Sequence, residues 1–274
     1  MTTNCISKTL SILSTIVVFS CNSGNNPDHD PDIVVPHVGI NAPVNIPYSI
    51  ISQYPHDTSA YTQGLEFFKG TLYEGTGDFE TSSLRITDHK KGNVMKMHLM
   101  GNKEIFGEGI TIFKNKIYQL TWQNHIVYIY DVNNIEKPVG TFSWPYEGWG
   151  LTHDSSSLII SDGSANIYFV DPETFKIKNT IAVKDDQGPV QMLNELEYVD
   201  GKIYANVYQT NIIVKIDAES GHVIGRLSLQ GLLQEKDIVP NRTDVLNGIA
   251  FDASTNHFFI TGKRWPKMFE IKLN

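Results

Sequence analysis

The residues of this chain that could do chemistry head five copies of one short stretch. In the second copy a single carboxylate, Glu108, lies between Gly107 and Gly109, and the alternating apolar run 110–113 follows Gly109. A carboxylate at the start of a strand can act as a general acid or base in a suitable site. The head residue changes from copy to copy, whereas a purely structural repeat would tend to reuse one type. The heads are Gln63, Glu108, Trp149, Asn194 and Asn247.

Hairpin geometry places a second set of residues beside these heads. A strand that leaves one face and the antiparallel strand that returns to it bring their outer ends together. The residues 14 positions after the second and fourth heads are Trp122 and Tyr208, and the residue 16 positions after the last head is Lys263. We therefore expect one mouth of a central channel to gather Gln63, Glu108, Trp122, Trp149, Asn194, Tyr208, Asn247 and Lys263.

Plainer interpretations of these residues stay open at this point. The position of Glu108 between glycines is also typical of an exposed acidic residue in a turn without a catalytic role. Lys263 is also typical of a solvated cation at the end of a strand. Trp122 and Trp149 also suit packing between repeats, and the head asparagines suit turn caps. The sequence lacks the ligand spacing of a zinc site, a nucleophilic-serine elbow and a phosphate-binding loop.

Each head begins a unit of short strands, and these units predict an all-β fold. Alternating apolar runs rich in Ile, Val, Thr, Tyr and Phe favour strands, and no long amphipathic helical pattern occurs. The heads recur at intervals of 41 to 53 residues, which is the period of a four-stranded propeller blade. Five copies predict a five-bladed β-propeller. The fifth copy has three strands, so we expect the spare N-terminal strand at 48–54 to join it and close the ring.

Composition and net charge indicate a chain that can form a full core and argue against one class of partner. The chain has 274 residues and 41% hydrophobic content, enough for a full core. A net charge of -8 leaves no basic footprint, so nucleic acid is not expected as a partner.

The N-terminal segment predicts export. Lys8 precedes an apolar run at residues 10–19, too short to span a bilayer and typical of a signal-peptide core. Its end, Val18-Phe19-Ser20-Cys21, resembles a bacterial lipobox with Val18 in place of the usual leucine, which implies lipidation of Cys21 in a periplasmic or outer-membrane-associated lipoprotein. A plain secretory signal cut elsewhere is the alternative. We expect a signal peptide at 1–21, a flexible tether at 22–44 and the propeller domain at 45–274.

Eight motifs, in order, carry a family resemblance across residues 45–274. They are Tyr61-Thr62-Gln63-Gly64-Leu65, Phe106-Gly107-Glu108-Gly109-Ile110-Thr111, Gln119-Leu120-Thr121-Trp122, Glu147-Gly148-Trp149-Gly150-Leu151, Leu193-Asn194-Glu195-Leu196-Glu197-Tyr198, Ala205-Asn206-Val207-Tyr208-Gln209-Thr210, Leu246-Asn247-Gly248-Ile249-Ala250 and Thr261-Gly262-Lys263-Arg264-Trp265-Pro266-Lys267. Together they resemble the plant and bacterial glutamine cyclotransferases.

The resemblance implies a five-bladed propeller that converts N-terminal glutamine of peptides and proteins to pyroglutamate and releases ammonia, without the catalytic zinc of the unrelated animal enzymes. It implies that Glu108 is the catalytic acid and base, and we expect Lys263 or Asn194 to donate toward the developing oxyanion. The resemblance implies a surrounding pocket of Gln63, Trp122, Trp149, Asn194 and Lys263, with Tyr61 and Phe106 beside it.

One position departs from the family pattern, because Tyr208 stands where the family usually has tryptophan, and Tyr208 forms one pocket wall here. The resemblance also implies a calcium ion in the channel, as in plant members, but the sequence shows no dedicated ligand set, and we expect no cofactor for the reaction. A monomer is expected.

Two other functions remain as alternatives. A non-catalytic surface propeller would bind peptides or glycans through the same aromatic mouth without releasing ammonia. A calcium-dependent, lactonase-like hydrolase would hold its metal on several carboxylates and amides, and the expected mouth contains one carboxylate.

Overall fold

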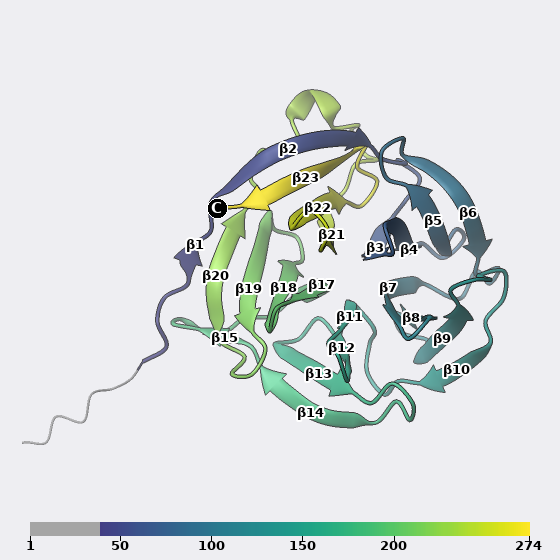
Figure 1. The fold of residues 1–274 in the computed structure, drawn as a ribbon, viewed down its shortest axis with the longest axis horizontal. Coiled ribbons are helices and arrows are strands. Elements are labelled where there is room, and N and C mark those ends of the chain that lie inside the picture. Colours follow the sequence, from purple (N-terminus) through teal and green to yellow (C-terminus); the bar gives the residue numbers. More distant parts are fainter. Residues whose placement is uncertain (1–38) are drawn as a thin grey trace, which may run out of the picture. The chain divides into compact units, whose positions relative to one another are not determined.

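In the computed structural model, which describes residues 39–274, five antiparallel sheets stand in a ring around a central axis (Figure 1). The innermost strand of each sheet contacts the innermost strands of both neighbours, which closes the ring. The predicted five-bladed propeller is confirmed. The predicted signal peptide with Cys21, and the predicted tether up to residue 38, lie outside the described residues.

The strands of each blade follow the chain outward from the axis, apart from the outermost strand of blade 5. Blade 1 holds β3 (Thr62–Phe68), β4 (Thr71–Thr76), β5 (Ser83–Asp88) and β6 (Asn93–Leu99), and blade 2 holds β7 (Gly107–Phe113), β8 (Lys116–Thr121), β9 (Ile126–Asp131) and β10 (Gly140–Ser143). Blade 3 holds β11 (Leu151–His153), β12 (Leu158–Ser161), β13 (Asn166–Val170) and β14 (Ile177–Ala182). Blade 4 holds β17 (Leu193–Val199), β18 (Lys202–Val207), β19 (Ile212–Asp217) and β20 (Val223–Ser228), and blade 5 holds β21 (Leu246–Asp252), β22 (His257–Gly262), β23 (Lys267–Leu273) and β2 (Tyr48–Pro55).

Burial falls from the inner strands to the outer ones, as the residue patterns require. All seven residues of β7 are buried, because an inner strand is covered by neighbouring blades on both faces. The outer strand β6 alternates between exposed and half-buried residues. The apolar core therefore lies between adjacent blades, where side chains such as Leu120 and Leu158 pack together.

The N-terminal part of the domain fastens two blades. Strand β2 pairs antiparallel with β23, so that Tyr48 lies opposite Leu273 and Tyr54 opposite Met268, which confirms the predicted closure. Before β2, the short strand β1 (Val44–Asn45) pairs parallel with β20 of blade 4. The pattern in the sequence did not predict this second pairing.

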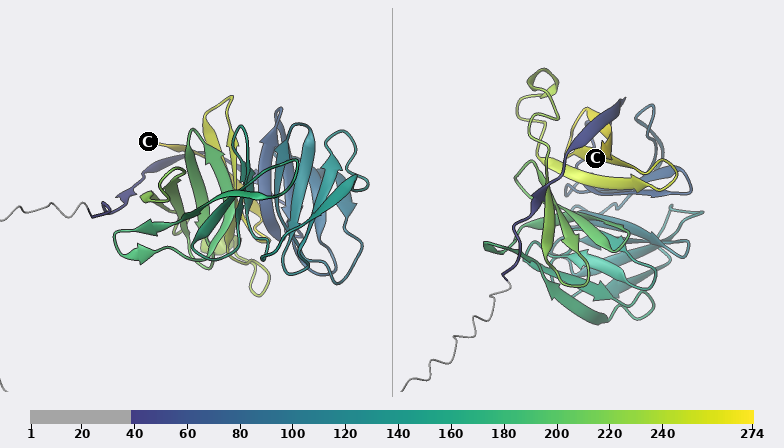
Figure 2. Two further views of the ribbon diagram at one scale, coloured as in Figure 1. Left: turned by 90° about the horizontal axis from the view of Figure 1, so that it is seen from below. Right: turned by 60° about the vertical axis from the view of Figure 1, so that its left-hand side comes forward.

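The remaining elements are small. Strands β15 (Lys184–Asp185) and β16 (Gly188–Pro189) form a hairpin. The 3-10 helix η1 (Glu235–Asp237) is connected to β23 by an ion pair between Asp237 and Lys267 at 2.6 Å. The side view in Figure 2 shows the strands of the blades running roughly along the ring axis. Among residues 39–274, no helix has the length and apolar character needed to cross a membrane.

Candidate active site

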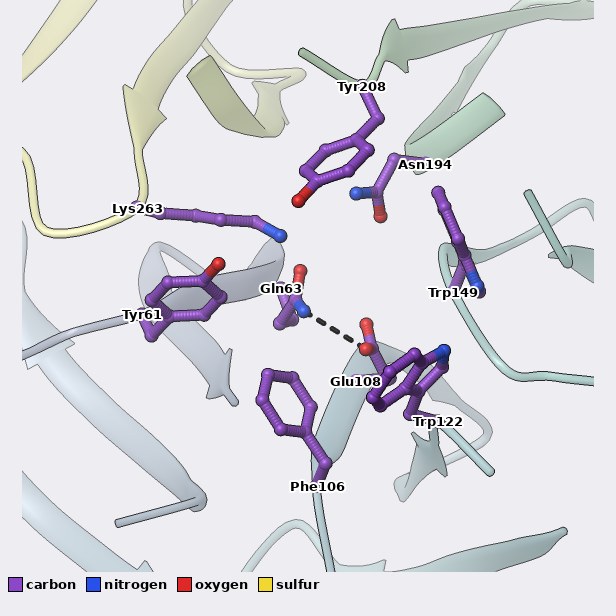
Figure 3. A pocket seen from close by; sticks show the side chains of 9 residues that line it. All are labelled: Tyr61, Gln63, Phe106, Glu108, Trp122, Trp149, Asn194, Tyr208 and Lys263. Atoms are coloured by element: carbon purple, nitrogen blue, oxygen red, sulfur yellow. Dashed lines mark hydrogen bonds between the residues drawn. The ribbon is translucent and has the colours of Figure 1, made fainter. Parts of the chain in front are cut away.

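One end of the central channel holds a pocket of about 220 Å³ to which all five blades contribute (Figure 3). Its walls are mostly aromatic, and four side chains carry amides or charges into it. The lining residues are Tyr61, Gln63, Phe106, Glu108, Trp122, Trp149, Asn194, Tyr208 and Lys263. The structure thus brings together seven of the eight residues expected at the mouth, together with Tyr61 and Phe106.

β-Bulges aim the head residues Gln63, Glu108 and Asn194 into this pocket. The pairing register shifts between Thr62 and Gly64, between Gly107 and Ile110, and between Leu193 and Leu196. Each shift leaves a head residue outside the regular ladder, and a bulge redirects the side chain it contains. The same shift occurs in blade 5 around Asn247.

Glycines after the heads let neighbouring inner strands approach one another. A Cβ added at Gly109 would lie 2.6 Å from the backbone nitrogen of Leu151 and 2.7 Å from the carbonyl oxygen of Trp149. A Cβ added at Gly150 of blade 3 would likewise clash with the carbonyl oxygen of Asn194 in blade 4. The recurring glycine therefore reflects backbone contact between blades, and it holds the heads close together.

Glu108 is a buried carboxyl group with one hydrogen-bond partner among residues 39–274. It is 4% exposed, and Gln63 Nε2 donates to its Oε1 at 3.0 Å. Asn247 lies behind Gln63 and outside the pocket lining, where its Nδ2 donates to Gln63 Oε1 at 3.1 Å and to the Thr62 carbonyl at 3.0 Å. Asn247 therefore orients the Gln63 amide so that its NH₂ group faces Glu108.

Burial raises the pKa of Glu108 well above its usual value of 4.5. The positive charge of Lys263 opposes this shift, and the negative charge of Glu147 adds to it. The sequence left open whether burial or Lys263 would dominate, and in the structure burial dominates.

Lys263 enters the pocket opposite Glu108 (Figure 3) and is 3% exposed. Its Nζ lies 4.7 Å from the ring centroid of Tyr61 and 4.8 Å from that of Tyr208, so two cation–π contacts replace part of its hydration. Burial lowers the pKa of Lys263, and the negative charges of Glu108 and Asp244 partly offset this effect.

A carboxylate that the sequence analysis did not single out holds both tryptophan walls. Glu147 Oε2 accepts hydrogen bonds from Trp122 Nε1 at 2.8 Å and from Trp149 Nε1 at 3.0 Å. The signal was present in the motif Glu147-Gly148-Trp149, but spacing along the chain does not show that Trp122 reaches the same oxygen. The rings of Trp149 and Tyr208 pack in a T-shaped arrangement with 5.6 Å between their centroids.

Asn194 supplies an amide with an open acceptor. It is 2% exposed, and its Oδ1 has no hydrogen-bond partner among the described residues. A buried acceptor without a partner costs free energy, so a bound molecule that donates an N–H to it would be favoured.

The carboxylates deeper in the channel do not fit the calcium ion that the resemblance implies. Both oxygens of Glu195 accept backbone N–H groups, from Leu65 at 3.1 Å and Ile249 at 2.8 Å. Glu197 and Glu66 likewise accept from backbone nitrogens. Residues 39–274 contain no group of three or more acidic, histidine or cysteine side chains placed to hold a metal. These carboxylates connect inner strands of different blades.

Known proteins resemble this chain over most of its length. The sequence profile of a family described as glutamine cyclotransferase matches residues 16–273. A glutaminyl-peptide cyclotransferase of Arabidopsis thaliana is 37% identical over 229 residues, covering 82% of this chain and 70% of the plant protein. The crystal structure of a glutaminyl cyclase from Myxococcus xanthus has a TM-score of 0.78 and 34% identity, covering 85% of this chain and 98% of that one.

Proposed function

The chain belongs to the glutamine cyclotransferase family, and from this premise we propose that it converts the N-terminal glutamine of peptides and proteins to pyroglutamate with release of ammonia. The observation that carries the catalytic assignment is the buried carboxyl group of Glu108, which faces an aromatic pocket and is oriented by Gln63.

Proton transfer is the task that suits Glu108. The neutral α-amine of the substrate attacks the side-chain amide carbon, a C–N bond forms, and Glu108 accepts the proton that the amine loses. Glu108 then gives this proton to the departing nitrogen, the old C–N bond breaks, and ammonia leaves with the lactam as the other product. A raised pKa suits both steps, because it makes the carboxylate a stronger base toward the amine than an ordinary glutamate, and the acid formed in that step can then protonate the departing nitrogen.

Charge on the substrate oxygen requires a donor in the same pocket. The Lys263 ammonium points into the pocket from the side opposite Glu108 (Figure 3), and Asn194 Nδ2 is a second donor. In a buried site such donors stabilise a developing oxyanion strongly. The open Oδ1 of Asn194 suits an N–H of the substrate.

The aromatic walls favour the reactive substrate conformer. Cyclisation is intramolecular, so the enzyme gains rate by holding the amine close to the amide carbon. The pocket volume of about 220 Å³ is below the range of pockets for drug-sized ligands and suits one amino-acid residue, while the rest of the peptide remains outside.

A coupled ammonia assay with glutamine-initiated dipeptides tests this function. The wild-type protein should release ammonia with and without a chelator, and Glu108→Gln should lose most of this activity. Glu197→Gln is the matched control, because Glu197 is also buried on an inner strand but lies outside the pocket. Peptide binding without ammonia release would support a binding propeller instead, and loss of activity with chelator would support a metal-dependent hydrolase.

Export and lipidation at Cys21 are part of this proposal, supported by the N-terminal sequence pattern. Labelled palmitate should be incorporated into the full chain in a bacterial host and not into Cys21→Ser. Light scattering on the soluble domain should give the mass of a monomer.

A further inference from the structure

We propose that Glu147 is a positioning residue of the glutaminyl pocket, whose carboxylate fixes the rings of Trp122 and Trp149 and places a negative charge beside these two pocket walls. This inference rests on the proposed function for its kinetic readout. It assigns a role to a side chain that does not line the pocket itself.

The hydrogen bonds of Glu147 connect two blades. Trp122 follows β8 of blade 2 and Trp149 precedes β11 of blade 3, and one oxygen, Oε2, accepts the indole N–H of both. The other oxygen accepts Gln123 Nε2 at 2.8 Å. Hydrogen bonds to an ionised acceptor are stronger than neutral ones, so this carboxylate limits the rotation of both rings.

The backbone around Glu147 is itself held in place. Trp144, 1% exposed, donates its Nε1 to the Glu147 carbonyl oxygen at 3.1 Å. The next residue, Gly148, donates its N–H to the carbonyls of Thr121 and Trp122 at 3.2 and 3.0 Å. Because these contacts hold the backbone at Glu147 in place, its carboxylate can hold the two indole rings in turn.

The charge of Glu147 persists over the pH range in which Glu108 changes its protonation. Partial burial raises the pKa of Glu147, but the hydrogen bonds from Gln123, Trp149 and Trp122 and the charge of His125 outweigh burial and lower it overall. The charged groups that act on Glu108 are Lys263, which lowers the pKa of Glu108, and Glu147, which raises it. Of the other polar residues that line the pocket, Tyr61 and Tyr208 are titratable phenols and Gln63 carries no charge.

Two substitutions separate the hydrogen bonds from the charge. Glu147→Gln keeps an oxygen acceptor of similar size and removes the charge, whereas Glu147→Ala removes both. Ammonia release would be measured as kcat and KM from pH 5 to 9, together with tryptophan fluorescence anisotropy and the thermal midpoint. Gln123→Ala is the control, because it removes the neutral partner of Glu147 and leaves the indole contacts.

We expect the acid limb of the kcat/KM profile to move to lower pH in both Glu147 variants, because Glu108 loses a neighbouring negative charge. The substrate amine has the same pKa in every assay, so the difference between variants belongs to the enzyme. We expect KM to rise about tenfold in Glu147→Ala and less in Glu147→Gln. Indole anisotropy should fall in Glu147→Ala and stay near the wild-type value in Gln123→Ala.

A Glu147→Gln variant with the wild-type pH profile would overturn the electrostatic part, and unchanged KM and indole anisotropy in a folded Glu147→Ala would overturn the positioning part. If Glu147→Ala unfolds, Glu147→Gln still tests the charge, and Glu147→Asp, with a shorter reach to the indoles, tests the positioning by KM and anisotropy. Absence of ammonia release from the wild-type protein would instead refute the proposed function, and indole anisotropy would still test the positioning.

Discussion

Glu108 and Lys263 shift toward their neutral forms for the same physical reason. Burial penalises both charges, and each charge partly relieves the penalty on the other. A pair arranged in this way suits a reaction in which a proton must be accepted and returned within one catalytic cycle.

The burial of Glu108 should make the stability of the fold depend on pH. Because the pKa of Glu108 is raised in the folded state, this group favours folding fully below the unfolded value of about 4.5 and loses that contribution as pH rises toward the folded value. Glu108→Gln removes the penalty and keeps an acceptor for Gln63. Its thermal midpoint should therefore match the wild-type value near pH 4 and exceed it by a few degrees near pH 8.

Thermal unfolding across pH 4 to 8 checks this expectation. Glu104→Gln, at an exposed glutamate, should show no such trend. A constant difference between Glu108→Gln and the wild-type protein at every pH would contradict the assigned burial effect.

Lys263 should act on turnover more than on affinity. Lys263→Met keeps the apolar stem and removes the donor, so kcat should fall about a hundredfold if the ammonium stabilises the oxyanion. Steady-state kinetics measure this effect. Lys215→Met is the control, because Lys215 also lies over a tyrosine ring, 5.6 Å from the centroid of Tyr204, but outside the pocket. A rise in KM at constant kcat would reassign Lys263 to substrate binding.

The sequence predicted which side chains line the pocket, but it did not predict which hydrogen bonds hold them in place. Head spacing and the family resemblance together predicted the lining residues, because strand ends in one ring face converge. The roles of Glu147 and Asn247 depend on side-chain directions, which spacing does not encode. Asn247 was expected at the mouth and lies behind Gln63 instead.

At the level of elements, a bulge and a following glycine work together at Gln63 and Glu108. The bulge aims the head side chain, and the glycine lets the next inner strand approach. Blade 4 differs, since Glu195 stands where the other copies have glycine, and its carboxyl group accepts N–H groups from blades 1 and 5. Alternation of apolar residues predicted the inner strands but not their bulges, because a bulge is defined by the pairing with the neighbouring strand.

Gly109→Ala should disturb the site without touching a pocket side chain. Its methyl group would meet three backbone atoms of blade 3, so the inner strands must separate. We expect kcat/KM to fall more than tenfold and the thermal midpoint to fall by several degrees. Gly140→Ala on the outer strand β10 is the control, because its nearest neighbour is a side-chain atom at 3.7 Å. Equal behaviour of the two variants would contradict this account.

At the level of the whole molecule, ring closure depends on the N-terminal strand. A truncation that starts at residue 47 removes β1 and keeps β2, whereas one that starts at residue 56 also exposes the edge of β23. We expect the first to fold with a slightly lower thermal midpoint and the second to aggregate, because an open sheet edge pairs with other chains. Size-exclusion chromatography and thermal unfolding distinguish these outcomes. A soluble monomer with the wild-type midpoint after the longer truncation would show that β2 is dispensable.

The global fold was the most predictable level. The regular period specified five blades, and the incomplete last copy specified how the ring closes. The parallel pair β1 and β20 escaped prediction, since two residues carry no recognisable alternation and Val44 falls at the end of the expected tether.

The closing strand also places the last residue of the chain beside the start of β2. The backbone nitrogen of Asn274 donates to the carbonyl oxygen of Pro47 at 3.0 Å. A circular permutant could therefore join the old C-terminus to Tyr48 through a short hairpin turn and begin near Ala60. Blade 5 would then be one uninterrupted polypeptide, and a seam that now depends on hydrogen bonds would become covalent.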